Sequence, residues 1–331
     1  MRTAIAILNW NGLDLLKTFL PSVVKYSDDA EVYVIDNQST DDSCSYIQEE
    51  FPEVRLIVND KNYGYSGGYN HGLKTLTEDV FVLLNNDVEV TEGWLIPIKK
   101  LFKTQNNVAV VQPKILDYKR KSYFEYAGAA GGFIDKFGYP YCRGRIFNTL
   151  EEDNGQYDQN VPIFWASGAC LAIRREVFYK AGALDENYFA HQEEIDLCWR
   201  VQNLGHQVMF AHKSQVYHNG GSTLSAYNPQ KTFLNFRNSL FNLIKNTKSP
   251  LRYYLVILRL LLDGIAGLKF LLSGEFKHFL AVLKAHVSFY INFSKVFKQR
   301  SGHIKLKKYA AINSIVWSYY VLKKNKYSDL Q

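Results

Sequence analysis

Short aliphatic segments alternate with helical patterns through the first 115 residues of this 331-residue chain. Strands are predicted at Thr3–Leu8, Glu31–Asp36, Val54–Asn59, Val80–Asn85 and Val108–Lys114. Helices are predicted between them at Asp14–Tyr26, Asp42–Phe51, Tyr69–Leu76 and Thr91–Phe102. Strands that alternate with helices of roughly ten residues form a parallel sheet covered by helices. The predicted fold class is therefore α/β, with a doubly wound, mostly parallel sheet.

The pattern changes twice after residue 115. Residues 118–162 are rich in Tyr, Gly and charge, and we expect them to be mostly loop. Further elements are predicted as a strand at Ala169–Ile173, helices at Arg174–Ala181 and Glu193–Leu204, and a strand at Gln207–Ala211. From Thr232 onward the chain consists of long apolar and aromatic helices studded with Lys and Arg. We predict one domain at 1–231, in halves of about 1–115 and 116–231, and a basic α-helical extension at 232–331.

The net charge of +7 is unevenly distributed. Residues 1–231 carry 22 basic and 29 acidic side chains, a net charge of −7, whereas residues 232–331 carry 17 and 3, a net charge of +14. Apolar residues make up 47% of the chain and charged residues 21%, which excludes a disordered chain. Because the body is acidic, nucleic acid is a poor partner for it.

Cysteine usage indicates the compartment. Cys44, Cys142, Cys170 and Cys198 are widely spaced and form no CxxC pair. This spacing argues against a zinc knuckle or a disulfide framework and favours a reducing compartment. The N-terminal apolar run Ala4–Leu8 is shorter than the roughly 7–15 residues of a secretory signal. We therefore expect the body to be cytoplasmic.

Three predicted strands end in polar residues, at Asn9–Asn11, Asp36–Asn37 and Asn85–Asp87. Ligands bind beyond the carboxyl ends of the strands in such sheets. Asp87 and Glu89 are two carboxylates one residue apart beyond a buried strand, a pattern suited to Mg²⁺ or Mn²⁺ bridged to phosphates. An ordinary solvated turn is the alternative.

Two segments suit a nucleotide. Asp36 could accept a hydrogen bond from the N3–H of a uracil or thymine ring, while Ser39 or Asp41 caps the following helix. Glycines in the segment 62–70 would let backbone amides approach a phosphate, although a plain turn is the alternative. This segment matches neither a dinucleotide fingerprint nor a P-loop.

Acidic residues crowd the start of the predicted helix at Glu193–Leu204. They either compensate the helix dipole or provide a general base. Asp196 could instead pair with Arg200 four residues later. His218 follows a strand, where it is either a structural histidine or a ligand completing the coordination of the cation.

In this order, these segments resemble a family-2 glycosyltransferase of the glycosyltransferase-A fold, in the rhamnosyltransferase-like subgroup of bacterial surface-polysaccharide synthesis. The matching strings are ILNWNG (7–12), VIDNQSTDDS (34–43), NYGYSGGYNHG (62–72), LLNNDVEVTEGWL (83–95), ASGACLAIRREVF (166–178), EEIDLCWR (193–200) and VYHNGGST (216–223).

The resemblance implies a role for each matched position. The nucleotide and donor would be held by Asn9, Asn11, Asp36, Asn37, Ser39, Asn62, Gly64, Gly67, Gly68, Asn86 and Asp87. The sugar and acceptor pocket would be lined by Trp165, Ser167 and Gly168. The metal would be held by Asp87, Glu89 and His218. The base is Glu194 by position, with Glu193 as a rival.

Two departures from the family pattern retain their carboxylates. The family's DxD reads D-x-E here, so the longer Glu89 could bind the metal through water. The family's Glu-Asp motif reads Glu193-Glu194. Both changes leave the acidic groups that the chemistry needs, so we expect activity to be kept.

The basic extension predicts contact with a membrane. Leu251–Leu272 is long enough to span a bilayer, but Arg259 and Asp263 near its middle oppose insertion. Flat docking on an anionic surface suits this segment and residues 276–300 better. A soluble helical domain or a homodimer interface is the alternative.

We therefore predict an inverting, metal-dependent hexosyltransferase at the cytoplasmic face of the cell membrane. It would move rhamnose or a hexose from a dTDP- or UDP-sugar to a glycan or lipid-linked glycan. One alternative is a nucleotidyltransferase making sugar nucleotides, although Asn9–Gly12 lacks the expected basic triphosphate loop. The other is a catalytically inactive, membrane-bound family member.

Overall fold

A mixed sheet forms the centre of the computed structural model, which describes residues 1–27, 29–220, 228–248, 250–300, 306 and 308–330. Its strands run in the order β11-β13-β6-β12-β4-β1-β2-β3, with β5 paired to β13. Their bounds are β1 Thr3–Asn9, β2 Glu31–Asp36, β3 Arg55–Val58, β4 Val80–Asn85, β5 Val88–Val90, β6 Val108–Asp117, β11 Val161–Pro162, β12 Cys170–Arg174 and β13 Gln207–His218.

Parallel pairing dominates this sheet. Strands β3, β2, β1 and β4 pair in parallel, and so do β6 and β13, whereas β12 runs antiparallel between β4 and β6. Both faces are covered, which is why the strands are continuous aliphatic runs such as Val80–Leu84, all buried. The predicted doubly wound, mostly parallel sheet is confirmed.

Helices pack on the sheet through apolar stripes. In α1 (Leu13–Lys25) the stripe is Leu16, Phe19, Leu20 and Val23, at helical spacing. The other helices are α2 Ser43–Glu50, α3 Gly64–Gly72, α4 Leu95–Thr104, α5 Arg175–Lys180, α6 Glu193–Asn203, α7 Pro229–Asn246, α8 Leu251–Leu272 and α9 Phe276–Lys298. Short 3₁₀ turns lie at Leu73–Thr75, Glu186–Tyr188 and Tyr327–Leu330, and a π turn lies at Trp317–Val321.

The glycine-rich segment differs from the prediction. It forms the first turns of α3, which begins at Gly64 rather than at Tyr69. A Cβ on Gly68 would lie 2.7 Å from the Leu8 side chain, and one on Gly72 would lie 2.5 Å from Ile35. The glycines therefore let the helix lie directly on β1 and β2, and this packing outweighs their low helix propensity.

Residues 118–162 are also more ordered than predicted. Four short strands form a second, antiparallel sheet in the order β10-β9-β8-β7. They are β7 Gly132–Ile134, β8 Pro140–Cys142, β9 Arg145–Ile146 and β10 Thr149–Leu150. Strands of two or three residues are too short to show an alternating pattern, so the sequence did not reveal them.

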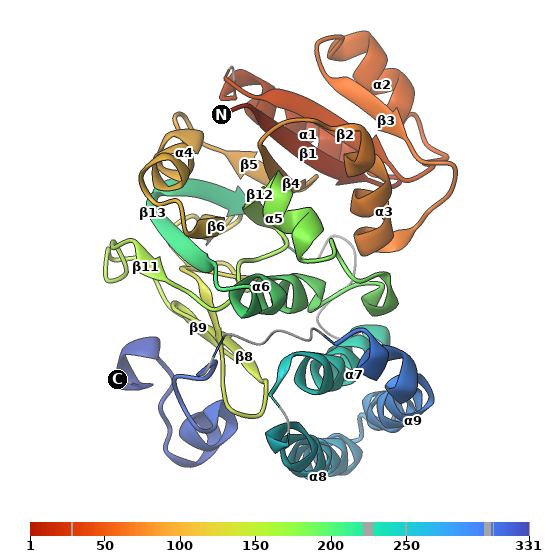
Figure 1. Ribbon diagram of the computed structural model, residues 1–331, viewed down its shortest axis with the longest axis vertical. Helices are drawn as coiled ribbons and strands as arrows, with labels where there is room; N and C mark the ends of the chain where they lie inside the picture. Colours follow the sequence, from red (N-terminus) through yellow and green to blue (C-terminus); the bar gives the residue numbers. More distant parts are fainter. Residues whose placement is uncertain (28, 221–227, 249, 301–305, 307, 331) are drawn as a thin grey trace.

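The C-terminal helices continue the main core. Leu240, Phe241, Leu243 and Ile244 of α7 are buried in the same cluster as Phe178 and Trp199. Figure 1 shows α6 between the sheet and α7, with α8 and α9 in the outer layer. The apolar core thus runs across the boundary predicted at residue 231. None of the described helices is long and apolar enough to cross a membrane.

Candidate active site

The carboxyl ends of β1, β2 and β4 bring the predicted nucleoside residues together. Asn9 and Asp36 are directly paired across the sheet, and Asn9 donates to the Asp36 carboxylate at 3.1 Å. Asn86 in turn donates to Asn9 at 2.9 Å. Three strand ends far apart in sequence therefore form one polar cluster.

Asp36 is fully buried within this cluster. Its oxygens accept bonds from the Ser39 backbone N–H at 2.7 Å and the Ser39 hydroxyl at 2.6 Å. The same hydroxyl accepts from the Asn11 backbone at 2.8 Å. Asp36 thus fixes the loops that carry Asn11 and Ser39. The N-cap of α2 is Asp42, whose side chain makes no cap hydrogen bond, so the prediction of Ser39 or Asp41 as the cap is wrong; Asp41 accepts from the backbone N–H of Ser43 at 3.1 Å from one position earlier.

Asn37 links this cluster to α3. Its side chain donates to Asn62 at 3.2 Å and to the Gly64 carbonyl at 2.9 Å. A Cβ on Gly68 would lie 2.7 Å from the Asn37 amide, and one on Gly67 would lie 2.8 Å from Tyr63. The glycines therefore allow close packing in α3, and the approach of their backbone amides to a phosphate stays a prediction.

Two of the three predicted metal ligands meet where the turn between β4 and β5 lies beside the end of β13. His218 Nε2 lies 3.1 Å from Asp87 Oδ1, and both side chains are buried. The other ring nitrogen of His218 lies 3.3 Å from Glu125, a residue that carried no signal in the sequence. Burial alone would lower the pKa of His218, but Glu125 and Asp87 outweigh it and raise that pKa to about 10.

These residues would suit a hard divalent cation that replaces the proton on His218, since a metal-bound imidazole is neutral. Asp87 and His218 would hold it, with Glu125 orienting the imidazole from behind, as carboxylates commonly do for metal-bound histidines. Glu89 instead holds Lys121 at 2.6 Å. Among the described residues no three acidic, His or Cys side chains are already arranged as a metal cage. The phosphates of a nucleotide would supply the remaining ligands, as is usual for Mg²⁺.

Glu193 and Glu194 begin α6. Burial raises the pKa of Glu194 to about 7, while burial and the charge of Glu194 raise the pKa of Glu193 well above its ordinary value. Each keeps one buried oxygen without a hydrogen-bond partner among the described residues. Two partly desolvated carboxyls side by side form a group poised to accept a proton near neutral pH.

Tyr65 connects these carboxyls to α3 and to the predicted sugar pocket. Burial raises the pKa of Tyr65, and the nearby charges of Glu193 and Glu194 add to this effect. Its hydroxyl donates to the Gly168 carbonyl at 2.7 Å. Gly168 is therefore at the site, and its own Cβ would lie 2.8 Å from that hydroxyl.

The other two predicted pocket residues are buried. Trp165 is 3% exposed, donates to the Phe133 carbonyl at 2.9 Å and lies against Gly132, where a Cβ would come within 2.0 Å of the ring. Trp165 therefore packs in the core rather than lining an open pocket. Ser167 is 1% exposed and bonds to Gln112 and Ala169, so it braces the loop that carries Gly168.

The loop before Glu193 is held by α7, a contact that the sequence did not predict. Phe189, His191 and Gln192 all have positive φ, between 65° and 70°. The Asn238 side chain donates to the carbonyls of Tyr188, Ala190 and His191 at 3.2, 3.0 and 2.7 Å. One amide on α7 thus stabilises the strained backbone that aims the two glutamates.

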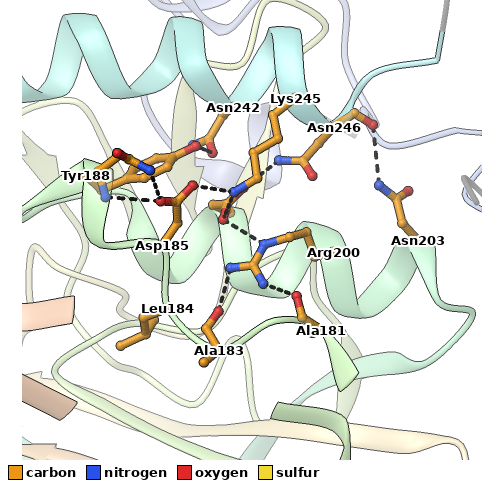
Figure 2. A network of polar contacts seen from close by, with 12 residues as sticks. Ala181, Ala183, Leu184, Asp185, Tyr188, Arg200, Asn203, Asn242, Lys245 and Asn246 are labelled. Carbon is orange, nitrogen blue, oxygen red and sulfur yellow. Dashed lines mark hydrogen bonds and ion pairs between the residues drawn. The ribbon is translucent and has the colours of Figure 1, made fainter. Parts of the chain in front are cut away.

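A buried ionic network fastens α6 to α7 just behind this loop (Figure 2). Lys245 contacts Asp185 at 2.7 Å and Asp196 at 2.9 Å, and Arg200 contacts Asp196 at 2.7 Å, which confirms the predicted pair. Burial would raise the pKa of Asp196, but Arg200 and Lys245 lower it to about 2. Each carboxylate in the network thus has a cationic partner, and each cation has a carboxylate partner. The matched string at 216–223 ends outside the described residues, which resume at 228.

Comparison with known proteins identifies the family. The family model for glycosyl transferase family 2 matches residues 4–182. The chain belongs to this family. It is 24% identical over 243 residues to the low-salt glycan biosynthesis hexosyltransferase Agl10 of Haloferax volcanii, covering 71% of this chain and 73% of that protein. It is also 25% identical over 202 residues to the N-acetylglucosaminyl-diphospho-decaprenol L-rhamnosyltransferase of Mycobacterium tuberculosis, covering 56% and 66%.

Solved structures share the fold of this family-2 glycosyltransferase. The mannosyltransferase PcManGT of Pyrobaculum calidifontis, solved with GDP-Man and Mn²⁺, superposes with a TM-score of 0.55 over 87% of both chains at 14% identity. GalNAc-T7, solved with UDP, GalNAc and Mn²⁺, gives 0.53 at 19% identity, over 66% of this chain and 43% of its own. The predicted glycosyltransferase-A fold is therefore confirmed, and the chain is a glycosyltransferase.

Proposed function

We propose that this glycosyltransferase inverts the anomeric centre, with Glu194 as the general base. The observation that carries the proposal is the buried oxygen of Glu194, which has no hydrogen-bond partner in the described part of the chain, together with the burial that raises the pKa of this carboxyl to about 7. In a single displacement, the acceptor hydroxyl attacks the anomeric carbon, Glu194 takes its proton and the nucleoside diphosphate leaves from the opposite face. Glu193 is the rival base, and burial and the charge of Glu194 raise its pKa well above its ordinary value.

We propose that the donor diphosphate lies beside Asp87 and His218. Mg²⁺ or Mn²⁺ bound there would supply positive charge next to the departing diphosphate. Glu125 orients His218, and Lys121 neutralises Glu89 until phosphate is present. Mn²⁺ in the solved neighbours supports a divalent cofactor.

The polar cluster at the strand ends suits the nucleoside. Asn9, Asn11, Asn37, Asn62 and Asn86 offer amides around the buried Asp36, and Ser39 lies beside them. We propose a dTDP- or UDP-sugar as donor, with rhamnose or a hexose as the transferred group. UDP in one solved neighbour and the rhamnosyltransferase name of one relative support this choice.

We propose a glycan or lipid-linked glycan as the acceptor, in accordance with the names of two relatives. The enzyme would then act at the cytoplasmic face of a membrane, through contacts made by the basic C-terminal helices. A homodimer through those helices is the alternative for that surface. An inactive scaffold is disfavoured by the retained carboxylates, and a nucleotidyltransferase by the absence of a basic triphosphate loop at Asn9–Gly12.

Donor turnover tests the proposal. The enzyme is incubated with Mn²⁺ or Mg²⁺ and dTDP-rhamnose, UDP-glucose, UDP-galactose or UDP-N-acetyl sugars, and the anomeric configuration of the product is read by NMR. Glu194→Gln should lower kcat by at least about 100-fold with unchanged nucleotide binding, because a base contributes roughly 10²–10⁴-fold. Glu193→Gln is the matched control and should retain more activity. A retained anomeric configuration, or full activity of Glu194→Gln, would refute the mechanism.

A further inference from the structure

In the hairpin of α8 and α9, the placement of apolar and charged side chains is the reverse of that in an ordinary surface helix. The two helices are joined by the turn Ser273–Glu275 and form the outer layer at the end of the molecule away from β1–β3 (Figure 1). A surface helix normally turns its apolar stripe inward and its charges outward. Here the central charged groups of α8 face the body of the protein.

The inward charges of α8 have defined partners. Arg259 contacts Asp263 at 2.7 Å, lies 3.6 Å from the centre of the Tyr139 ring and donates to the Phe137 carbonyl at 3.0 Å. Asp263 also accepts from the Tyr139 hydroxyl at 3.0 Å. The two charges that opposed membrane insertion in the sequence therefore fasten the helix to the loop after β7, and they are absent from its outer face.

Large apolar side chains cover that outer face. On α8, Ile257, Leu261, Ile265 and Leu272 recur at intervals of four and seven residues, and each is more than half exposed. On α9, which packs against α8, Val287 and Ile291 are also more than half exposed, with Ile291 76% exposed. Exposed apolar stripes on two adjacent helices mark an interaction surface, because soluble proteins rarely leave large apolar patches in contact with water.

The exposed charges on these two helices are mostly positive. Lys269, Lys277, Lys284 and Lys295 are exposed on the two helices, whereas Glu275 in the turn is their exposed acidic neighbour. Residues 232–331 as a whole carry a net charge of +14. A second copy of the same cationic surface would be repelled, while an anionic lipid surface would be attracted.

We infer that the outer face of α8 and α9 docks flat on an anionic lipid bilayer. Ile257, Leu261, Ile265 and Ile291 enter the boundary between headgroups and acyl chains, and the lysines contact lipid phosphates. This inference gives the proposed membrane contact a defined surface. It does not depend on the transfer chemistry, because binding is measured without substrate.

Vesicle binding of the full chain tests the surface. Ile265→Glu and Ile291→Glu are compared with Ile96→Glu on α4, because Ile96 is 67% exposed and Ile265 is 66% exposed. Co-sedimentation is measured with phosphatidylcholine vesicles, with and without phosphatidylglycerol. Each α8 or α9 variant should bind anionic vesicles at least about tenfold more weakly, since it removes an apolar side chain that the bilayer would bury and adds a negative charge. Ile96→Glu should bind like the unaltered chain.

A charge variant and two readouts complete the experiment. Lys277→Ala should weaken binding to anionic vesicles about fivefold, whereas the exposed Lys100→Ala on α4 should have no effect. Sugar transfer to a water-soluble acceptor, which tests the proposed function separately, should be unchanged in Ile265→Glu. Equal binding of Ile265→Glu and Ile96→Glu overturns the inference. Lack of vesicle binding by the unaltered chain also overturns it. If the unaltered chain is a dimer and Ile265→Glu is a monomer, the face instead binds a second copy of the chain, which overturns the inference as well.

Discussion

Replacing Lys245 with Met should destabilise the protein through the network that joins α6 to α7 (Figure 2). Lys245 is 3% exposed and contacts both Asp185 and Asp196. Asp196 would keep Arg200 and Asn246, at 2.7 and 2.8 Å. Asp185, which is 8% exposed, would keep bonds from Asn187 but lose its cation.

The size of the effect follows from the loss at Asp185. Removing one partner of a buried ion pair costs about 3–5 kcal/mol, because the remaining charge stays desolvated. An unfolding entropy of about 2.1 cal/mol/K per residue, applied to 331 residues, makes each kcal/mol worth about 1.4 °C. The Lys245→Met variant should therefore melt about 4–7 °C lower if unfolding is cooperative.

Calorimetry and urea unfolding measure this loss, with the exposed Lys248→Met as the matched control. The double variant Asp185→Asn, Lys245→Met should recover at least about half of the stability, because it removes the uncompensated charge. The stability contributed by Asp196 is present above pH 3.8 and is lost as the pH falls towards 2, so the single variant should show a weaker acid dependence. A loss below about 1 kcal/mol, or no recovery in the double variant, would refute the reasoning.

Three further predictions concern the site and the fold. The rate at saturating substrate should rise with pH to a plateau above about 7, since Glu194 must be ionised to accept a proton, and a flat profile from pH 5 to 9 would contradict this role. Asn238→Ala should lower kcat more than it raises KM and should shift the pH profile, because the loop before Glu193 loses its donor. Asn238→Asp, which keeps only acceptors, should not restore kcat. An unchanged pH profile would show that Asn238 is purely structural. Gly72→Ala should destabilise the fold by about 1–3 kcal/mol in urea unfolding through its contact with Ile35, while Gly264→Ala on α8, with nothing within 4 Å, should be neutral or slightly stabilising.

The local sequence pattern was sufficient to predict a strand that is buried on both faces of the sheet. The strand Val80–Asn85 was predicted with the bounds that the structure has. A strand buried on both faces is a continuous aliphatic run, so its composition alone identifies it. The strand ends followed from topology, and so did the meeting of Asn9, Asp36 and Asn86. In each case the signal lies in a short run of consecutive residues.

Long-range packing explains what the sequence did not reveal. Gly68 and Gly72 are helical because α3 lies directly on two strands, and Trp165 is buried because it lies against Gly132. Glu125 reaches His218 from a loop more than 90 residues earlier, and Asn238 reaches the strained loop from a helix more than 40 residues later. Such contacts have no local periodicity, so only the assembled structure identifies these residues.

The position of α7 has a consequence for how such an enzyme can diversify. The family match ends at residue 182, so it includes the strand ends proposed for the donor but neither the glutamates of α6 nor the helix that aims them. Most residues proposed for the donor thus precede α6 in the chain, whereas His218 follows it at the end of β13. Exchanging α7 through α9 between relatives would change the support of the glutamates and the outer surface while leaving the strand ends, Asp87 and His218 in place.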